Sequence, residues 1–229
     1  MKIIDDPDLR ERVRVFKDRE EAGKKLAEFL KNKLKERENL VVLAIPRGGV
    51  PIGCIVAREL GAELDLVIVK KIPVPWDPEA GFGAITPDGD IFVDDRIIAY
   101  LGLDKKTIRQ LADEVLSEIR RREKAFLGDR SRVSLEHKSV VLVDDGLATG
   151  YTMLAAVKYA KKRNPKNIFI ATPTASGGAL SLLAKHVDTI FCLNVRAGIP
   201  YFAVADAYVY WTDLTDEDVI EYLRKFGYV

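Results

Sequence analysis

The sequence predicts an α/β fold: a doubly wound, mainly parallel sheet with a small hood and a flexible lid loop. Three observations support this class. Short apolar runs bounded by turn residues recur along the 229 residues, and they are typical of strands buried on both faces of a parallel sheet. Segments with helical periodicity alternate with these runs, as in repeated strand–helix units. Small-residue or charged turns follow several runs, where open α/β sheets bind ligands. We therefore expect one domain over residues 1–229.

Composition limits the classes of function. Apolar residues make up 48% of the chain, enough for a sizeable core, and the net charge is only +1. Bulk attraction to nucleic acid or to an acidic membrane is therefore not indicated. The first residues are too charged for a signal peptide, and no apolar run is long enough to span a bilayer, so we expect a cytoplasmic protein. Cys54 and Cys192 lie in apolar surroundings and are interpreted as buried thiols in a reducing compartment.

The first 70 residues show the alternation of strands and helices clearly. Residues 1–17 have no clear period, whereas the next segment places its apolar residues on one helical face. Asp18 and Glu21 have the spacing of an N-cap pair at its start, and Gly61 has the position of a helix-terminating residue. The predicted elements are a helix over 20–37, a strand over 40–45, a helix over 50–60 and a strand over 63–69.

Two of the turns in this part carry positive charge. One follows the first strand and contains Arg47, Gly48 and Gly49 (the Arg-Gly-Gly turn). Its glycines let the backbone approach a ligand closely, and its arginine supplies a rigid fork of donors. The next strand runs into Lys70 and Lys71, which could reach the same anion or mark a solvated strand exit. Of the two lysines we favour Lys71 as a ligand.

The segment 72–90 lacks a helical period and contains four prolines and several glycines. Loops of this length in compact domains are usually functional lids or disordered, and we expect a lid. A hairpin is predicted around its Pro-Asp-Gly turn, between 81–85 and 90–93. Glu79 also lies in this segment, and we favour a solvent-exposed carboxylate over a substrate contact.

A helical insertion over about 95–127 is expected after the lid. Its main helix, 104–126, has one apolar stripe and begins after Asp104, which has the position of an N-cap. The outer face carries both signs of charge, including Arg120 to Arg122, and we interpret it as solvated. The helix could serve a dimer interface.

The most informative stretch is 140–152, VVLVDDGLATGYT. An apolar run leads into Asp144 and Asp145 (the acid pair), and a Gly/Thr-rich loop follows before a helical pattern from Met153. This loop offers backbone N–H groups, two threonine hydroxyls and a helix N-terminus, which together suit a phosphate group. The carboxylates would repel that phosphate and need donors, which the vicinal hydroxyls of a polyol supply. The stretch therefore predicts a sugar phosphate site.

This stretch resembles the phosphoribosyl-pyrophosphate (PRPP) motif of type I phosphoribosyltransferases. The resemblance implies transfer of a 5-phosphoribosyl group from PRPP to a nitrogen acceptor, expected to be a nucleobase, with release of pyrophosphate. It implies Mg²⁺ held through PRPP near the acid pair rather than by direct protein ligands. The implied catalytic residues are Asp144, Asp145, Arg47 and Lys71. The implied contacts to the 5′-phosphate are Ala148, Thr149, Gly150, Tyr151 and Thr152, and those to pyrophosphate are Arg47, Gly48, Gly49, Lys70 and Lys71.

Three further points concern this resemblance. In the family, the loop that corresponds to the Arg-Gly-Gly turn often contains a cis peptide. Ala148 stands where the 6-oxopurine enzymes have an aspartate that hydrogen-bonds the purine, so hypoxanthine or guanine salvage based on that aspartate is not expected. Residues 16–27 and 75–85 resemble a subgroup of predicted phosphoribosyltransferases whose acceptor the sequence does not name.

After the motif, further strand–helix alternation leads to a C-terminal hood over about 194–229. In this family such terminal segments select the acceptor, and an aromatic hood would suit stacking on a planar nucleobase, although aromatic residues in such segments more often serve plain packing. The aromatic residues are Tyr201, Phe202, Tyr208, Tyr210 and Trp211. The predicted elements are strands over 167–172 and 189–193, a small-residue turn over 173–178, a short helix over 181–185 and a last helix from Thr215 with Asp218 as capping-box partner.

The expected partners are PRPP and a small-molecule acceptor, without a membrane or nucleic acid, and a homodimer is expected. The alternative is a non-catalytic PRPP- or nucleotide-sensing regulatory protein of the same fold. The lysine pair and the complete Arg-Gly-Gly turn favour an enzyme, because a sensor needs less machinery at the leaving group. A different phosphate-handling enzyme is disfavoured, since the sequence contains neither a Walker loop nor a dinucleotide fingerprint.

Overall fold

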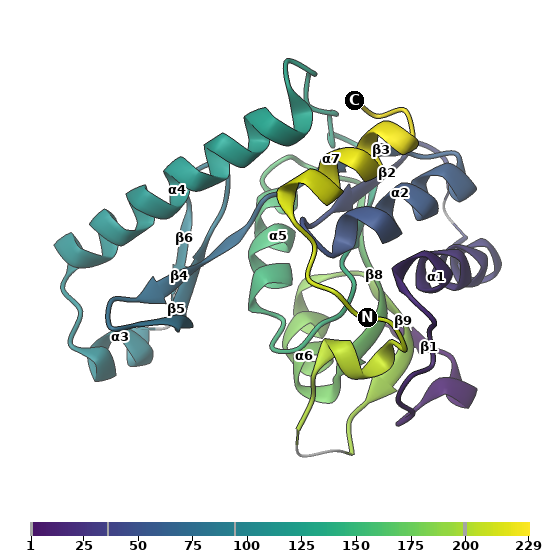
Figure 1. Cartoon of the computed structure of the whole chain (residues 1–229), viewed down its shortest axis with the longest axis horizontal. Coiled ribbons are helices and arrows are strands. Elements are labelled where there is room, and N and C mark those ends of the chain that lie inside the picture. Colours follow the sequence, from purple (N-terminus) through teal and green to yellow (C-terminus); the bar gives the residue numbers. More distant parts are fainter. Residues whose placement is uncertain (1, 36, 94, 199–200) are drawn as a thin grey trace.

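A six-stranded parallel sheet forms the centre of the molecule (Figure 1). The computed structural model describes residues 2–35, 37–93, 95–198 and 201–229, without the side chains of 78–80 and 95–96. The strand order is β1-β9-β8-β7-β2-β3, and every neighbouring pair is parallel. The strands are β1 (Lys2–Asp5), β2 (Leu40–Ala44), β3 (Glu63–Leu66), β7 (Ser139–Val143), β8 (Asn167–Ser176) and β9 (Thr189–Arg196). This topology confirms the predicted doubly wound sheet.

Helices cover both faces of the sheet, and the alternation of side chains along each strand feeds two separate cores. In β7, Val141 and Val143 pack into the core that contains α1 and α2, whereas Val140 and Leu142 pack into the core that contains α5 and α6. Successive side chains of a strand point to opposite faces, so an unbroken apolar run is needed when both faces are covered. The helices are α1 (Arg19–Lys33), α2 (Gly49–Leu60), α5 (Tyr151–Lys161), α6 (Gly177–Leu183) and α7 (Asp216–Lys225).

Local signals fix the ends of several helices as predicted. The Asp18 carboxylate accepts a hydrogen bond from the Glu21 backbone N–H at the start of α1. Gly61 ends α2 in the left-handed region, with φ 64°, a conformation that glycine adopts at little cost. Thr215 and Asp218 form a capping box at α7. Short polar side chains at these positions satisfy backbone N–H groups that have no partner within the helix.

Three elements differ from the sequence prediction. The segment 1–17, for which no period was recognised, contains the edge strand β1 and a short 3-10 helix, Pro7–Leu9. The predicted turn over 173–178 is wrong, because β8 continues to Ser176 through buried threonines and alanine paired with β9. The predicted short helix begins earlier, at Gly177, where the Ser176 hydroxyl accepts a hydrogen bond from the Ala179 N–H.

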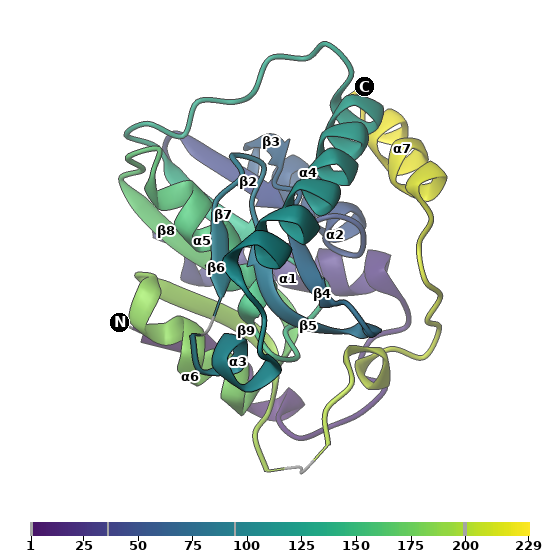
Figure 2. The same ribbon diagram turned by 90° about the vertical axis from the view of Figure 1, so that its left-hand side faces the viewer.

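Residues 70–127 form an arm that extends from one side of the central sheet (Figures 1 and 2). It contains a three-stranded antiparallel sheet, β4 (Lys70–Val74), β5 (Asp77–Ile85) and β6 (Ile91–Val93), followed by α3 (Asp95–Leu101) and α4 (Lys105–Leu127). The predicted hairpin at the Pro-Asp-Gly turn is confirmed by the β5–β6 pairing. The segment expected as an irregular lid thus has regular structure, since β4 pairs with β5 as well.

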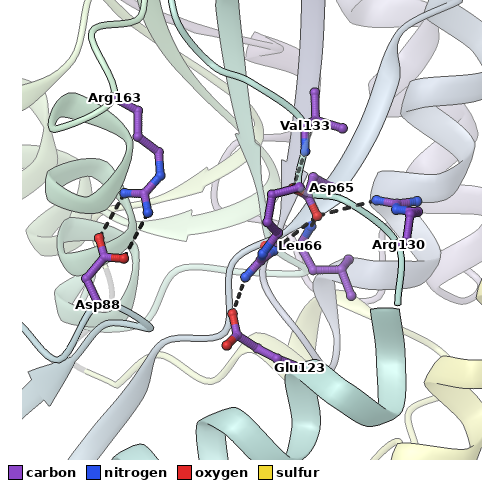
Figure 3. Close-up of polar contacts among 8 residues, drawn as sticks. Asp65, Leu66, Asp88, Glu123, Arg130, Val133 and Arg163 are labelled. Carbon is purple, nitrogen blue, oxygen red and sulfur yellow. Dashed lines mark hydrogen bonds and ion pairs between the residues drawn. The ribbon is translucent and has the colours of Figure 1, made fainter. Parts of the chain in front are cut away.

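A buried carboxylate ties the base of the arm to the core (Figure 3). Asp65 on β3 is only 3% exposed. Its carboxylate accepts hydrogen bonds from Arg130 Nη2 at 3.4 Å, Arg132 Nη1 at 3.1 Å and the Val133 N–H at 3.0 Å. Arg132 also pairs with Glu123 of α4. Charge-assisted bonds of this kind are about twice as strong as neutral ones, so they hold the end of α4 against β3.

A second ion pair joins the arm to the far end of α5. Arg163 follows α5 and donates to both carboxylate oxygens of Asp88, each at 2.9 Å (Figure 3). Asp88 lies in the turn between β5 and β6, so the tip of this hairpin is fixed to the core.

The state of the two cysteines and the character of the helices can be described directly. Cys54 and Cys192 are buried free thiols. Within the part of the chain that the structure describes, no helix combines the length and the apolar character needed to cross a membrane.

Candidate active site

The acid pair and the Arg-Gly-Gly turn meet at one edge of the sheet. They follow β7 and β2, which are neighbours with Ala44 opposite Val143. A Cβ atom at Gly48 would lie 1.9 Å from Asp145 Oδ2, and one at Gly49 would lie 2.6 Å from the Val143 carbonyl oxygen. Only glycine permits such close approach. The Pro46–Arg47 peptide bond is cis, as the family resemblance leads us to expect.

Asp145 is held inside the protein. Its side chain accepts a hydrogen bond from Arg19 Nε at 2.8 Å, and the residue is 9% exposed. The Tyr208 hydroxyl donates to the Asp145 carbonyl oxygen at 2.6 Å. The Arg19 guanidinium also stacks on Trp211, 3.9 Å from the ring centroid. We had expected both acids to accept sugar hydroxyls, but one oxygen of Asp145 already has a partner within the chain.

Asp144 is half-buried and lies nearer to solvent. Its Oδ1 accepts a hydrogen bond from the Asp145 N–H at 2.9 Å. Burial and the adjacent carboxylate raise the pKa of Asp144 well above its ordinary value. Burial also raises the pKa of Asp145, although Arg19 opposes this shift. A donor or a cation beside the acid pair would therefore be bound strongly, because it favours the ionised form.

The loop of residues 146–152 (the phosphate loop) is anchored behind and open in front. The Leu147 N–H donates to the Thr174 carbonyl at 3.0 Å, and the Ser176 hydroxyl donates to the Ala148 carbonyl at 2.6 Å. Gly150 has φ 83° and is the N-cap residue of α5, and no side chain of the described residues caps this helix. Free N–H groups at a helix N-terminus favour an anion. Residues 148, 149 and 151 are exposed there.

Lys70 and Lys71 point to different parts of the molecule. Adjacent residues of a strand face opposite sides, and Lys70 pairs with Glu118 of α4. Lys71 instead lines a cavity of about 840 Å³ between the arm and α5, together with Thr149, Tyr151 and Thr152. Lys71 therefore lines the same cavity as the phosphate loop, whereas Lys70 is paired with α4 of the arm.

Arg47 points towards the first turn of α7, where its Nη1 lies 3.8 Å from Asp216 Oδ1. Two arginines of α4 reach the same carboxylate: Arg121 at 3.3 Å and Arg122 at 3.2 Å. The sequence interpretation of a solvated helix face is wrong for Arg122, whose side chain is 16% exposed. Helix α7 packs beside α4 and removes that part of the face from water.

The predicted aromatic hood divides into packed and exposed residues. Tyr208 is buried and its ring contacts Phe16 and Trp211, with centroids 5.7 and 5.1 Å apart. Tyr201 and Tyr210 are exposed. The packed residues Tyr208 and Trp211 contact Asp145 and Arg19, respectively. No local pattern in the sequence indicates these contacts. The Glu79 side chain lies outside the described residues.

The acid pair is also the place in this site where carboxylates could contact a metal ion. Among the described residues, no group of three or more His, Cys, Asp or Glu side chains could hold a metal ion. The carboxylates of Asp144 and Asp145 supply the oxygen atoms that Mg²⁺ prefers, but further ligands would have to come from PRPP and water.

A helix N-terminus without a side-chain cap lies beside two carboxylates, at the carboxyl edge of a doubly wound α/β sheet, where proteins of this class bind their ligands. Comparison with known proteins gives the family. The family model of the phosphoribosyl transferase domain matches residues 95–207. Two curated relatives from Mycobacterium tuberculosis, provisionally named phosphoribosyl transferases, are 35% identical over 213 residues, which are 93% of this chain and 47% of theirs.

Two solved structures resemble this chain. TT1426 from Thermus thermophilus is 33% identical, with a TM-score of 0.74 and coverage of 92% of this chain and 98% of that one. The AQ2163 protein from Aquifex aeolicus, at 16% identity and a TM-score of 0.50 over 83% of this chain and 78% of its own, shares the fold. The chain belongs to the phosphoribosyl transferase family, as its motif predicted. It spans about half the length of the curated relatives it matches.

Proposed function

We propose that this protein transfers a 5-phosphoribosyl group from PRPP to a nitrogen acceptor, expected to be a nucleobase, and releases pyrophosphate. The contact between Gly48 and Asp145 carries the proposal. It puts the Arg-Gly-Gly turn, suited to pyrophosphate, against the acid pair, which leads directly into the phosphate loop. A ribose with phosphate groups at both ends matches this order of sites.

The proposed roles follow from the charge that develops during the reaction. Breaking the bond between ribose and pyrophosphate leaves positive charge on the sugar and negative charge on the leaving group. Asp144 would accept ribose hydroxyls and favour the positive sugar, and Asp145, held by Arg19, would keep Asp144 in place. Arg47 would balance the leaving pyrophosphate. The N-terminus of α5 would hold the 5′-phosphate, with the threonines of the phosphate loop.

Magnesium would be held mainly by PRPP, near Asp144 and Asp145. When bound, it would neutralise part of the charge on the leaving pyrophosphate, and it would keep several waters. The acid pair suits this arrangement, because the raised pKa of Asp144 is relieved by a nearby positive charge.

The proposal also includes the predicted division of the chain. The hairpin within 72–90 would act as a lid that excludes water from the reactive sugar, the helices within 95–127 form the insertion, and residues 194–229 form the hood over the acceptor. A cytoplasmic homodimer remains part of this prediction.

The direct test is pyrophosphate release from PRPP and Mg²⁺ across a panel of nucleobases. Asp144→Asn should lower the rate by about 100-fold or more, the usual effect of losing one electrostatic group that acts on the transition state. Asp113→Asn, which changes an exposed aspartate of α4 in the same way, should leave it unchanged.

The same assay separates the alternative function. Both Asp145 and Arg47 already have counter-ions within the chain, as a PRPP- or nucleotide-sensing protein could also have. If PRPP binds but no acceptor gives turnover, the sensing function replaces the catalytic one.

A further inference from the structure

Three arginines from two distant segments surround one carboxylate at the start of α7. Arg47 of the Arg-Gly-Gly turn, Arg121 and Arg122 all lie within 4 Å of Asp216, at 3.8, 3.3 and 3.2 Å. Helices α4 and α7 lie side by side at this point (Figures 1 and 2). The arm thus reaches the residue that the family resemblance assigns to pyrophosphate.

The cluster has an excess of positive charge. Arg122 also lies 3.6 Å from Glu118, which in turn pairs with Lys70. Four cations therefore face two carboxylates, Asp216 and Glu118. Hydrogen bonds with Thr215 and, to a smaller extent, the charge of Arg47 lower the pKa of the nearby Asp218, so this third carboxylate leaves an excess of one positive charge. A site with more cations than anions favours a ligand that carries several negative charges.

The Asp216 carboxylate binds Arg47 weakly. Its Oδ1 is buried but has no hydrogen-bond partner among the described residues. Arg47 Nη1 lies 3.8 Å from this oxygen, beyond hydrogen-bonding distance. The Arg47 side chain is 39% exposed. A buried acceptor without a hydrogen-bond partner is costly. The Asp216 carboxylate is therefore suited to being replaced by another anion beside Arg47.

We propose that Arg121 and Arg122 join Arg47 in binding the pyrophosphate group of PRPP, and that Asp216 is an internal counter-ion which pyrophosphate replaces. Guanidinium groups form paired hydrogen bonds with phosphate oxygens, and pyrophosphate offers more oxygens and more charge than one carboxylate. The inference rests on the proposed function and gives the inserted helix α4 a role at the leaving group.

The test is calorimetric titration of the full chain with inorganic pyrophosphate, and separately with ribose 5-phosphate, at fixed ionic strength. The double change Arg121→Gln and Arg122→Gln should weaken pyrophosphate binding about tenfold or more, as expected for lost charge-assisted bonds. Ribose 5-phosphate should bind as before, which also reports that the variant is folded. Arg120→Gln removes one positive charge from the same helix at an exposed position and should change neither affinity.

Asp216→Asn gives the opposite signal. Removal of the competing carboxylate should tighten pyrophosphate binding several-fold, whereas a purely structural ion pair would leave the affinity unchanged or weaken it. Asp216→Ser makes the same change in charge and keeps a side chain favoured at helix starts, so it replaces the asparagine variant if that variant unfolds.

The inference is overturned if wild-type protein does not bind pyrophosphate, if the double arginine variant binds it as tightly as Arg120→Gln, or if both Asp216 variants fail to tighten binding. Failure of the proposed function would look different, because turnover would be absent with every acceptor while these pyrophosphate titrations kept their expected order.

Discussion

Gly48 is the residue at which the Arg-Gly-Gly turn meets the acid pair. Its missing side chain leaves room for the Asp145 carboxylate, which in turn accepts a hydrogen bond from Arg19. Three segments that are far apart in the sequence therefore depend on one position without a Cβ atom. The site consequently tolerates little change in volume here, since packed interiors relax only partly.

Gly48→Ala should damage both stability and binding. The added Cβ would lie 1.9 Å from Asp145 Oδ2, so the turn or the acid pair must move. We expect a loss of about 1–3 kcal/mol in the free energy of unfolding, measured by urea denaturation, and loss of PRPP binding in calorimetry.

Gly178→Ala is the matched control. A Cβ there would meet only the Ser176 hydroxyl, at 3.8 Å, and the residue lies in the first turn of α6. Alanine should leave PRPP binding unchanged and raise stability by about 0.5–1 kcal/mol. Equal behaviour of the two variants would show that the close approach at Gly48 is unimportant.

Asp144 should reduce the stability of the ligand-free protein at neutral pH. Its pKa is raised above the ordinary value of 3.8, so the folded state binds this proton more tightly than the unfolded state. The protonated Asp144 side chain therefore stabilises the folded state relative to the ionised one. This stabilisation is complete below pH 3.8 and is lost as the pH rises through the pKa of the folded state. Asp144→Asn cannot ionise and should therefore melt at a higher temperature than wild type near pH 7.

The pH dependence is the decisive part of this measurement. The difference in melting temperature between Asp144→Asn and wild type should shrink as pH falls towards 3.8. A difference that is constant with pH would contradict the shifted pKa. The exposed Asp113→Asn should melt as wild type throughout.

The residues of the site differ in how far the sequence could predict them. Asp144, Gly48 and Thr149 belong to local patterns and could be found by reading along the chain. Arg19 could not, because its contact with Asp145 joins residues 126 positions apart. The one local signal was an arginine in the first turn of a helix, where a positive charge opposes the helix dipole.

At the scale of elements, Asp65 fastens the arm to β3. Its two arginine partners are only partly exposed, at 29% and 33%, and the carboxylate is buried. The bond geometry is thus fixed mainly by the protein and less by water. The arm and the core should consequently unfold together.

Asp65→Ala should be strongly destabilising. It removes the counter-ion of Arg130 and Arg132 and the acceptor of the Val133 N–H. Breaking a buried ion pair costs about 3–5 kcal/mol, and we expect about 2–4 kcal/mol because water reaches the arginines in part. Urea denaturation measures this change. Glu59→Gln, which breaks the exposed Lys31–Glu59 pair, should have no measurable effect, and a similar loss in both variants would contradict a special role for Asp65.

Element types were predictable where periodicity was strong. The apolar stripe of α4 and the unbroken apolar runs of β2 and β7 identify these elements directly. β1 is short and half-exposed, so it has no pattern of its own. β8 was predicted too short because its last residues are small and include Pro173, which resembles a turn although the strand continues. Pairing with β9 overrides that local preference.

For the whole molecule, the class of fold followed from the alternation of strands and helices, but the strand order did not. Order depends on contacts between distant segments, such as β2 with β7 and β1 with β9. The arm is a further case, because the Pro-Asp-Gly turn signals only its β5–β6 hairpin, whereas the pairing of β4 with β5 and the contact with α7 have no local signature. The candidate leaving-group site contains residues of the core and of the arm. Only the three-dimensional structure therefore shows that Arg122 and Arg47 lie beside the same carboxylate.

The pairing of β1 with β9 has a consequence for biosynthesis. β1 is synthesised long before its partner, Thr189–Arg196, leaves the ribosome. Until then, the first strand has no sheet edge to join, and the nascent chain must keep it apart from other nascent chains. A ribosome that stalls before β9 would thus release an incomplete sheet whose β8 edge is open to aggregation.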